Sequence, residues 1–299
     1  MNWILVTVFG AFFQNLRSSL QKKLNKDVST IASTYIRFAF ALPFAAILFF
    51  LFFRDLHVIN TVLIQPGFLF NVLLASIFQI IFTFILLYLF NFSNFVVGTS
   101  LSKTEVIQVA LFEYLILNEK LNKFGISGII ISTLGVILLS VKDLKLFFNN
   151  LFSKTTLIGL ISGLFLALSV VYFRAAILTL ENINSNFGKA ISALFIGLFI
   201  QTLILTFYLI FFERSEFKKL YNDKYECLLT GIAGLFASLS WFYAFTLIQS
   251  SFVRAVGQVE LLFSYFSSRY LFKEKIRFTE IMGIIIFVLG VTILLLSRT

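Results

Sequence analysis

The sequence predicts an all-α integral membrane protein with ten transmembrane helices, arranged as two inverted five-helix repeats. Composition, long apolar runs and an internal repeat carry this prediction. Of 299 residues, 59% are hydrophobic, only 13% are charged, and the mean hydropathy is +0.97, whereas soluble domains carry about 25% charged residues. One soluble core cannot hide so much apolar surface. The composition therefore excludes a soluble enzyme, a disordered chain and a nucleic-acid binder, and we assign the net charge of +10 to cations facing lipid headgroups.

Apolar runs of helical length alternate with short polar breaks, which favours membrane-spanning helices over a β-barrel. The first run lacks a basic region before it and a cleavage site after it, so we interpret it as an uncleaved span. Because the breaks leave no room for a domain outside the membrane, function must lie inside the helix bundle. The predicted spans are 3–21, 31–53, 68–91, 95–117, 124–141, 156–178, 187–212, 227–248, 251–272 and 278–297.

Two segments of the chain repeat one another. Residues 73–139 align with 228–294 at one offset of 155 residues, without a gap. Five spans per copy is an odd number, so the second copy should enter the membrane the opposite way round, as in many secondary transporters. We predict repeats over 1–148 and 149–299. The informative matches are Tyr88/Tyr243, Glu105/Glu260, Glu119/Glu274, Lys120/Lys275, Gly128/Gly283 and Gly135/Gly290.

The end of each copy carries a similar block of residues. The blocks are Leu117-Asn118-Glu119-Lys120-Leu121 with Gly128 and Gly135, and Phe272-Lys273-Glu274-Lys275-Ile276 with Gly283 and Gly290. Both resemble the EamA repeat of the drug/metabolite transporter superfamily, and residues 17–21, 35–38, 241–245 and 253–260 resemble one bacterial branch of its permeases. The resemblance implies ten helices in two inverted halves, a central cavity and transport by alternating access.

Charged residues inside the predicted spans mark the candidate site. A charge at the bilayer centre costs roughly 2.5–3.5 kcal/mol on insertion scales, so it must face the bundle interior, form a pair or neutralise. Six cations against three acids favour a ligand with a negative group. They are Arg17, Arg37, Lys103, Arg174, Arg254 and Arg269, and Glu105, Glu113 and Glu260.

Glu105 and Glu260 are equivalent in the repeat, and each lies about eleven residues into its span. We expect them to face each other or to line one cavity, as ligand-binding or proton-coupling groups; the alternative is a structural hydrogen bond between helices. Lys103 lies two residues before Glu105, about 160° around the helix, so the two cannot share a face. Lys103 either points into a different wall of the cavity or forms an internal ion pair with another helix, with Glu113 as one candidate. Its repeat equivalent is Gln258.

Further polar residues are candidates for ligand binding or gating. Arg254 and Gln258 lie one turn apart and suit a carboxylate or phosphate, whereas Gln14, Arg17 and Gln21 form a polar stripe on the first span. Arg17, Arg37 and Arg254 have the alternative of extending to the membrane interface.

Other residues receive structural or open interpretations. Trp241, Tyr243 and Tyr88 are candidates for lining the cavity, with lipid contact or packing as the alternative. We interpret Glu119 and Glu274 as ion-paired parts of a structural turn, and the repeated glycines as close-packing faces. We interpret Arg174 and Arg269 as interfacial anchors. The role of Glu113 is left open.

These observations predict a secondary-active transporter of a small anionic or zwitterionic metabolite, such as an amino acid, in the cell inner membrane, with proton coupling as an option. The alternative is a non-transporting structural or assembly protein. No cofactor or metal site is expected, because nucleotide-binding, catalytic and metal motifs are absent. Partners should be a small molecule and the lipid bilayer, not nucleic acid, and a homodimer is an open option. The excess of basic residues in the loops after odd-numbered spans places both termini outside, whereas the resemblance implies cytoplasmic termini.

Overall fold

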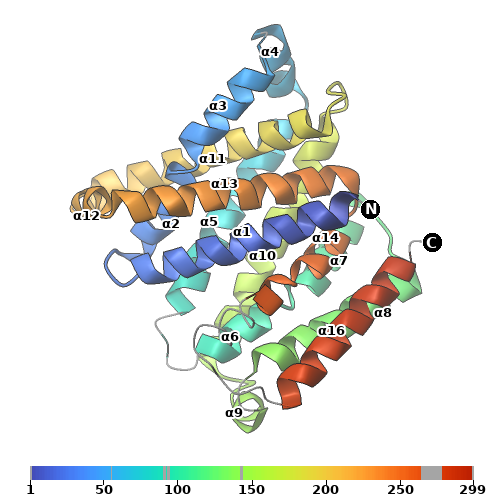
Figure 1. Cartoon of the computed structure of the whole chain (residues 1–299). Helices are drawn as coiled ribbons and strands as arrows, with labels where there is room; N and C mark the ends of the chain where they lie inside the picture. Colours follow the sequence, from blue (N-terminus) through green and yellow to red (C-terminus); the bar gives the residue numbers. More distant parts are fainter. Residues whose placement is uncertain are drawn as a thin grey trace.

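A computed structural model describes residues 2–54, 56–89, 92, 95–141, 144–263 and 278–297, and these residues form helices joined by turns, with no strand among them (Figure 1). The helices are α1 Asn2–Leu24, α2 Thr30–Ala39, α3 Leu42–Phe52, α4 Leu56–Ile64, α5 Phe68–Leu89, α6 Phe95–Ser102, α7 Glu105–Leu117, α8 Lys123–Ser140, α9 Leu144–Asn149, α10 Lys154–Thr179, α11 Asn186–Phe212, α12 Glu216–Asn222, α13 Lys224–Leu247, α14 Ser250–Gly257 and α16 Phe278–Leu296.

Seven described segments are long and apolar enough to cross a membrane: Thr30–Phe52, Phe68–Leu89, Lys123–Ser140, Lys154–Thr179, Asn186–Phe212, Lys224–Leu247 and Phe278–Leu296. The predicted span 3–21 corresponds to α1, which carries the polar stripe and is less apolar. The predicted span 95–117 is absent from the seven because a break divides it into α6 and α7. The predicted span 251–272 lies partly outside the described residues.

The helix predicted over 95–117 is interrupted at Lys103 and Thr104, so the expectation of one continuous helix was wrong. Both residues donate their backbone N–H three residues back, to Ser100 and Leu101, and the Thr104 hydroxyl donates to the Leu101 carbonyl at 2.7 Å. Such local bonds compete with the α-helical pattern. The same interruption lies at Gln258 and Val259, so the offset of 155 residues relates α6 to α14 at both of their ends.

A third interruption divides the predicted span 31–53 into α2 and α3. Pro43 lies in the first turn of α3, where its missing N–H is tolerated, but its ring clashes with a carbonyl of a preceding helical turn. The chain therefore leaves the helix at Phe40 and Ala41. The break places Arg37 in the last turn of α2, inside the bundle.

Helices α8 and α16 pack along one another, while α1 packs against α13 and α5 against α10 (Figure 1). The repeated glycines lie at the contact of α8 and α16, as predicted for close-packing faces. A Cβ at Gly128 would come within 2.6 Å of the Leu294 backbone nitrogen, and one at Gly283 within 2.6 Å of the Leu139 nitrogen. Residues that rise along α8 thus meet residues that fall along α16, so the two helices run antiparallel.

We expect Gly135→Leu to destabilise the protein, because its Cβ would lie 2.8 Å from the Gly283 carbonyl oxygen and from the Phe287 Cα. Overpacking of a tight contact costs roughly 1–3 kcal/mol, occasionally more. Thermal unfolding in detergent measures the effect. Leu134→Ile is the matched control, because Leu134 is the neighbouring residue and is exposed. Equal midpoints for both variants would contradict this close packing.

Candidate functional site

A cavity of about 180 Å³, here called the central cavity, collects most of the predicted charged residues. It lies among α1, α5, α6, α7, α10 and α14, so both repeats contribute to it. Its wall combines three cations and two carboxylates with amide and hydroxyl groups. The lining residues are Gln14, Asn15, Arg17, Ser18, Phe82, Leu86, Thr99, Ser102, Lys103, Glu105, Leu166, Arg254, Glu260 and Leu261.

Glu105 and Arg254 form a buried ion pair at the wall of the central cavity. Arg254 donates from Nε to Oε1 of Glu105 at 3.2 Å and also from Nη2 to the same oxygen. Glu105 is the first residue of α7, and not part of the middle of a long helix as predicted. A carboxylate is favoured there, because the N-terminus of a helix is electropositive. The second oxygen, Oε2, is buried and has no hydrogen-bond partner among the described residues.

Lys103 and Glu260 form the second ion pair. Glu260 also accepts a hydrogen bond at 2.5 Å from Nε2 of Gln14, which ties it to α1. Lys103 and Glu105 line the same cavity but bind different partners, Glu260 and Arg254. This agrees with the expectation that the two residues do not share a face and that Lys103 forms an internal ion pair. The partner of Lys103 is Glu260, so the proposed pairing with Glu113 is wrong.

Gln258 and Trp241 support the wall without being among the lining residues. Gln258 donates from Nε2 to the carbonyl oxygen of Lys103 at 2.9 Å. This hydrogen bond joins the helix break after α14 to the helix break after α6. The indole of Trp241 donates to Oε1 of Gln14 at 2.9 Å, and its ring lies 4.8 Å from Cζ of Arg254. Both residues therefore position the charged groups.

Three further candidates on α1 and α2 are buried, so none of them extends to the membrane interface. Arg17 lines the central cavity and is only 4% exposed, yet its Nε and Nη1 have no hydrogen-bond partner among the described residues. Arg37 donates to the Thr83 hydroxyl at 2.8 Å. Gln21 donates to the Ser33 carbonyl at 3.0 Å, joining α1 to α2. Of these three, Arg17 therefore faces the cavity.

Tyr88 and Tyr243, two candidates for lining the cavity, lie elsewhere. Tyr88 is 41% exposed and stacks on Phe84. Tyr243 lines a separate apolar pocket with Leu5 and Phe9. A repeat match predicts that two positions are equivalent, but it does not predict which way the side chains point, so the cavity assignment fails for both.

A second buried charge cluster, here called the Arg174 cluster, was not predicted. Arg174 donates to both oxygens of Glu119, at 3.0 and 2.6 Å, and its Nε lies 3.5 Å from Oε1 of Glu113. Glu113 in turn accepts hydrogen bonds from the backbone N–H groups of Ser250 and Ser251 at the start of α14. Arg174 is thus not an interfacial anchor, and Glu119 is ion-paired as expected, with Arg174 as its partner.

Arg174 also donates to the carbonyl oxygens of Phe245 and Ile248, at the end of α13. The cluster therefore satisfies backbone groups on both sides of the α13–α14 junction. The available signal was Glu113, a span acid with no acidic mate in the repeat. The other predicted anchor, Arg269, and the repeat equivalent Glu274 lie outside the described residues.

The chemistry of the central cavity is that of a binding site for charged groups. Within the described part of the chain, no group of three or more His, Cys, Asp or Glu residues is placed to hold a metal ion. The wall holds Arg17, Lys103 and Arg254 against Glu105 and Glu260, which leaves an excess of one positive charge. Guanidinium groups suit carboxylates and phosphates, which they bind through paired hydrogen bonds.

Two of the three comparisons with known proteins find a match. A solved structure described as "Crystal structure of protein" aligns over 100% of this chain and 99% of its own, with a TM-score of 0.68 and 12% sequence identity, so it shares the fold. No curated protein matches the sequence. The model of the EamA-like transporter family matches residues 1–141 and 153–296, nearly the whole chain in two repeats. The chain is therefore a multi-pass membrane protein that belongs to the EamA-like transporter family, within the drug/metabolite transporter superfamily.

Proposed function

We propose that this protein is a secondary-active transporter with ten spans in two inverted halves, which moves a small anionic or zwitterionic metabolite across the cell inner membrane by alternating access. The antiparallel contact of α8 and α16 supports the inversion, because these helices are equivalent in the repeat. The crossed packing of α1 with α13 and α5 with α10 supports two interlocked halves. Such halves place a substrate site between them.

The proposed substrate class rests on the environment of Arg17. Its guanidinium is buried in the wall of the central cavity without a partner for Nε and Nη1 among the described residues. Buried guanidinium N–H groups without an acceptor are costly, so a ligand that brings a carboxylate or phosphate would satisfy them. The cavity of about 180 Å³ has room for a small organic ligand in place of several waters. This size fits an amino acid or a compound of similar size.

A panel of small metabolites tests the proposal. A ligand that binds only the native state raises its apparent stability, by about 2.7 kcal/mol at one hundred times its Kd. We expect anionic or zwitterionic compounds to raise the unfolding midpoint of the purified full chain, and the same compounds to show counterflow in proteoliposomes. Stabilisation and counterflow by organic cations alone would contradict the substrate class.

Our proposal includes proton coupling, because two carboxylates hold Lys103 and Arg254. If Glu105 or Glu260 takes up a proton, its cation becomes available to an anionic ligand, so proton and ligand would bind together. This link is supported by the ion pairs of Lys103 with Glu260 and of Arg254 with Glu105.

We expect Glu105→Gln to reduce accumulation driven by a pH gradient while counterflow of the same ligand continues. The amide still accepts a hydrogen bond from Arg254 but takes up no proton, so Glu260 alone of the two carboxylates remains for coupling. Uptake into proteoliposomes, with and without the gradient, measures the difference. Glu226→Gln is the control, since Glu226 forms a surface pair with Lys23. Under the alternative of a structural protein, Glu105→Gln lowers stability and no flux occurs with either chain.

A further inference from the structure

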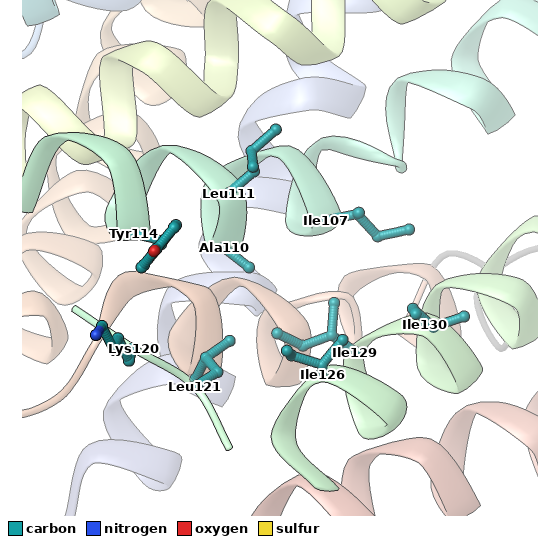
Figure 2. A pocket seen from close by; sticks show the side chains of 9 residues that line it. All are labelled: Ile107, Ala110, Leu111, Tyr114, Lys120, Leu121, Ile126, Ile129 and Ile130. Carbon is teal, nitrogen blue, oxygen red and sulfur yellow. The ribbon is translucent and has the colours of Figure 1, made fainter. Parts of the chain in front are cut away.

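An apolar groove lies between α7 and α8, outside the central cavity. It has a volume of about 460 Å³. Figure 2 shows Ile107 and Leu111 of α7 on one wall and Ile126 and Ile130 of α8 on the other. From Ile107 to Tyr114 the helix rises about 10 Å at 1.5 Å per residue. The groove is therefore long and apolar enough to hold a segment of an acyl chain.

The lining of the groove is exposed, and in a bilayer it would contact lipid. Ile107, Leu111, Tyr114, Ile126 and Ile130 are all exposed, although they belong to helices of a membrane-spanning bundle. In a bilayer such surfaces contact acyl chains, and a concave one holds a chain in a fixed position more readily than a flat one. The shape and composition of the groove thus select an apolar chain.

One end of the groove is polar. Lys120 and the hydroxyl of Tyr114 lie together at that end (Figure 2). The neighbouring Glu119 is ion-paired with Arg174. Lys120 itself makes no ion pair within the described part of the chain. The ammonium group therefore remains for an external anion.

A second cavity, of about 330 Å³, adjoins this end and shares Lys120 and Leu121 with the groove. The polar residues Asn122, Gln249 and Ser297 line it. An apolar slot that opens into a polar pocket beside one lysine has the form of a site for an amphiphile with an anionic head. Basic residues near the membrane surface attract anionic lipids.

We propose that this groove binds one anionic phospholipid, with an acyl chain between α7 and α8 and the phosphate at Lys120. The lipid bridges α7, whose first residue Glu105 belongs to the central cavity, and α8, which packs on α16. The site is separate from the proposed transport site, so either can exist without the other.

Native mass spectrometry of the detergent-solubilised full chain tests the proposal, with phosphatidylglycerol and phosphatidylcholine of identical acyl chains as probes. We expect one phosphatidylglycerol to be retained several-fold better than phosphatidylcholine. Lys120→Gln should remove this preference, and Ile130→Trp, which fills the groove, should reduce retention of both lipids. Lys154→Gln is the matched control, because Lys154 is an exposed lysine at the start of α10 and does not line the groove.

Three results would overturn the proposal. The first is equal retention of the two lipids by the unmodified chain, and the second is an equal loss of preference in Lys154→Gln. The third is a dimer that excludes lipid and that Ile130→Trp dissociates, which would identify a second copy as the occupant.

A separate competition experiment distinguishes a lipid site from a free-anion site. We expect that glycerol phosphate, which has no acyl chains, does not compete with the lipid. Full competition would count against the lipid. The unfolding midpoint of each variant checks that it is folded.

Discussion

Replacing Arg17 by Met should strongly weaken ligand binding while raising the stability of the ligand-free protein. The guanidinium is buried, and its Nε and Nη1 have no hydrogen-bond partner among the described residues. A buried charged group whose N–H donors lack acceptors is costly in the empty protein, so an apolar chain of similar length removes that cost. Glu260 keeps Lys103 and Gln14 as partners, so the fold does not depend on Arg17.

The loss of binding should be large. Hydrogen bonds to charged groups contribute about 1.5–3 kcal/mol each, and every 1.4 kcal/mol is about tenfold in Kd. We therefore expect Arg17→Met to weaken binding of an anionic ligand by about tenfold to a hundredfold. Isothermal titration with the best compound of the metabolite panel measures Kd, and thermal unfolding without ligand measures stability.

Arg17→Lys is the matched variant. It keeps the positive charge but loses the planar fork, so we expect binding between that of the unmodified chain and that of Arg17→Met. A strong loss of stability in Arg17→Met, with Kd unchanged, would show that Arg17 serves the fold rather than the ligand.

The sequence predicts the helices and the identity of the charged groups better than it predicts their partners. Depth and repeat position single out Glu105, Glu260, Lys103 and Arg254, and all four line one cavity. Their pairing did not follow, because helical periodicity fails at the break near Lys103. The break itself depends on local hydrogen bonds of Ser and Thr side chains, which are common inside membrane helices without breaking them.

Arg174 illustrates a second limit of sequence reasoning. Its place near the end of a predicted span suggests an interfacial anchor, but α10 runs through the bundle and Arg174 is buried there. Its partners Glu113 and Glu119 lie far away in the chain, Glu119 by 55 residues. Only the packing of α7 against α10 brings them together, and no local pattern encodes that contact. The boundary between the repeats near residue 148 and a homodimer stay predictions.

Replacing Arg174 by Met should cause a larger loss of stability than replacing any other single charge in the part of the bundle that the structure describes. The change leaves Glu113 and Glu119 without their cation and frees the Phe245 and Ile248 carbonyl oxygens. Removing one partner of a buried ion pair costs roughly 3–5 kcal/mol. We expect a large fall in the thermal unfolding midpoint in detergent. Arg214→Met is the control, because Arg214 is exposed and bonds to the carbonyl of Ile210 within its own turn of the chain.

A double variant separates the lost ion pair from simple loss of packing. If the uncompensated carboxylates cause the instability, Glu119→Gln should be far less harmful in the Arg174→Met background than alone, because the remaining charge to be buried is smaller. Coupled buried residues commonly show interaction energies of about 0.5–3 kcal/mol. Strictly additive effects would mean that Arg174 acts through the backbone carbonyls alone. The two arginines then differ in the sign of their effect: removing Arg17 stabilises the empty bundle, whereas removing Arg174 opens the junction of α13 and α14.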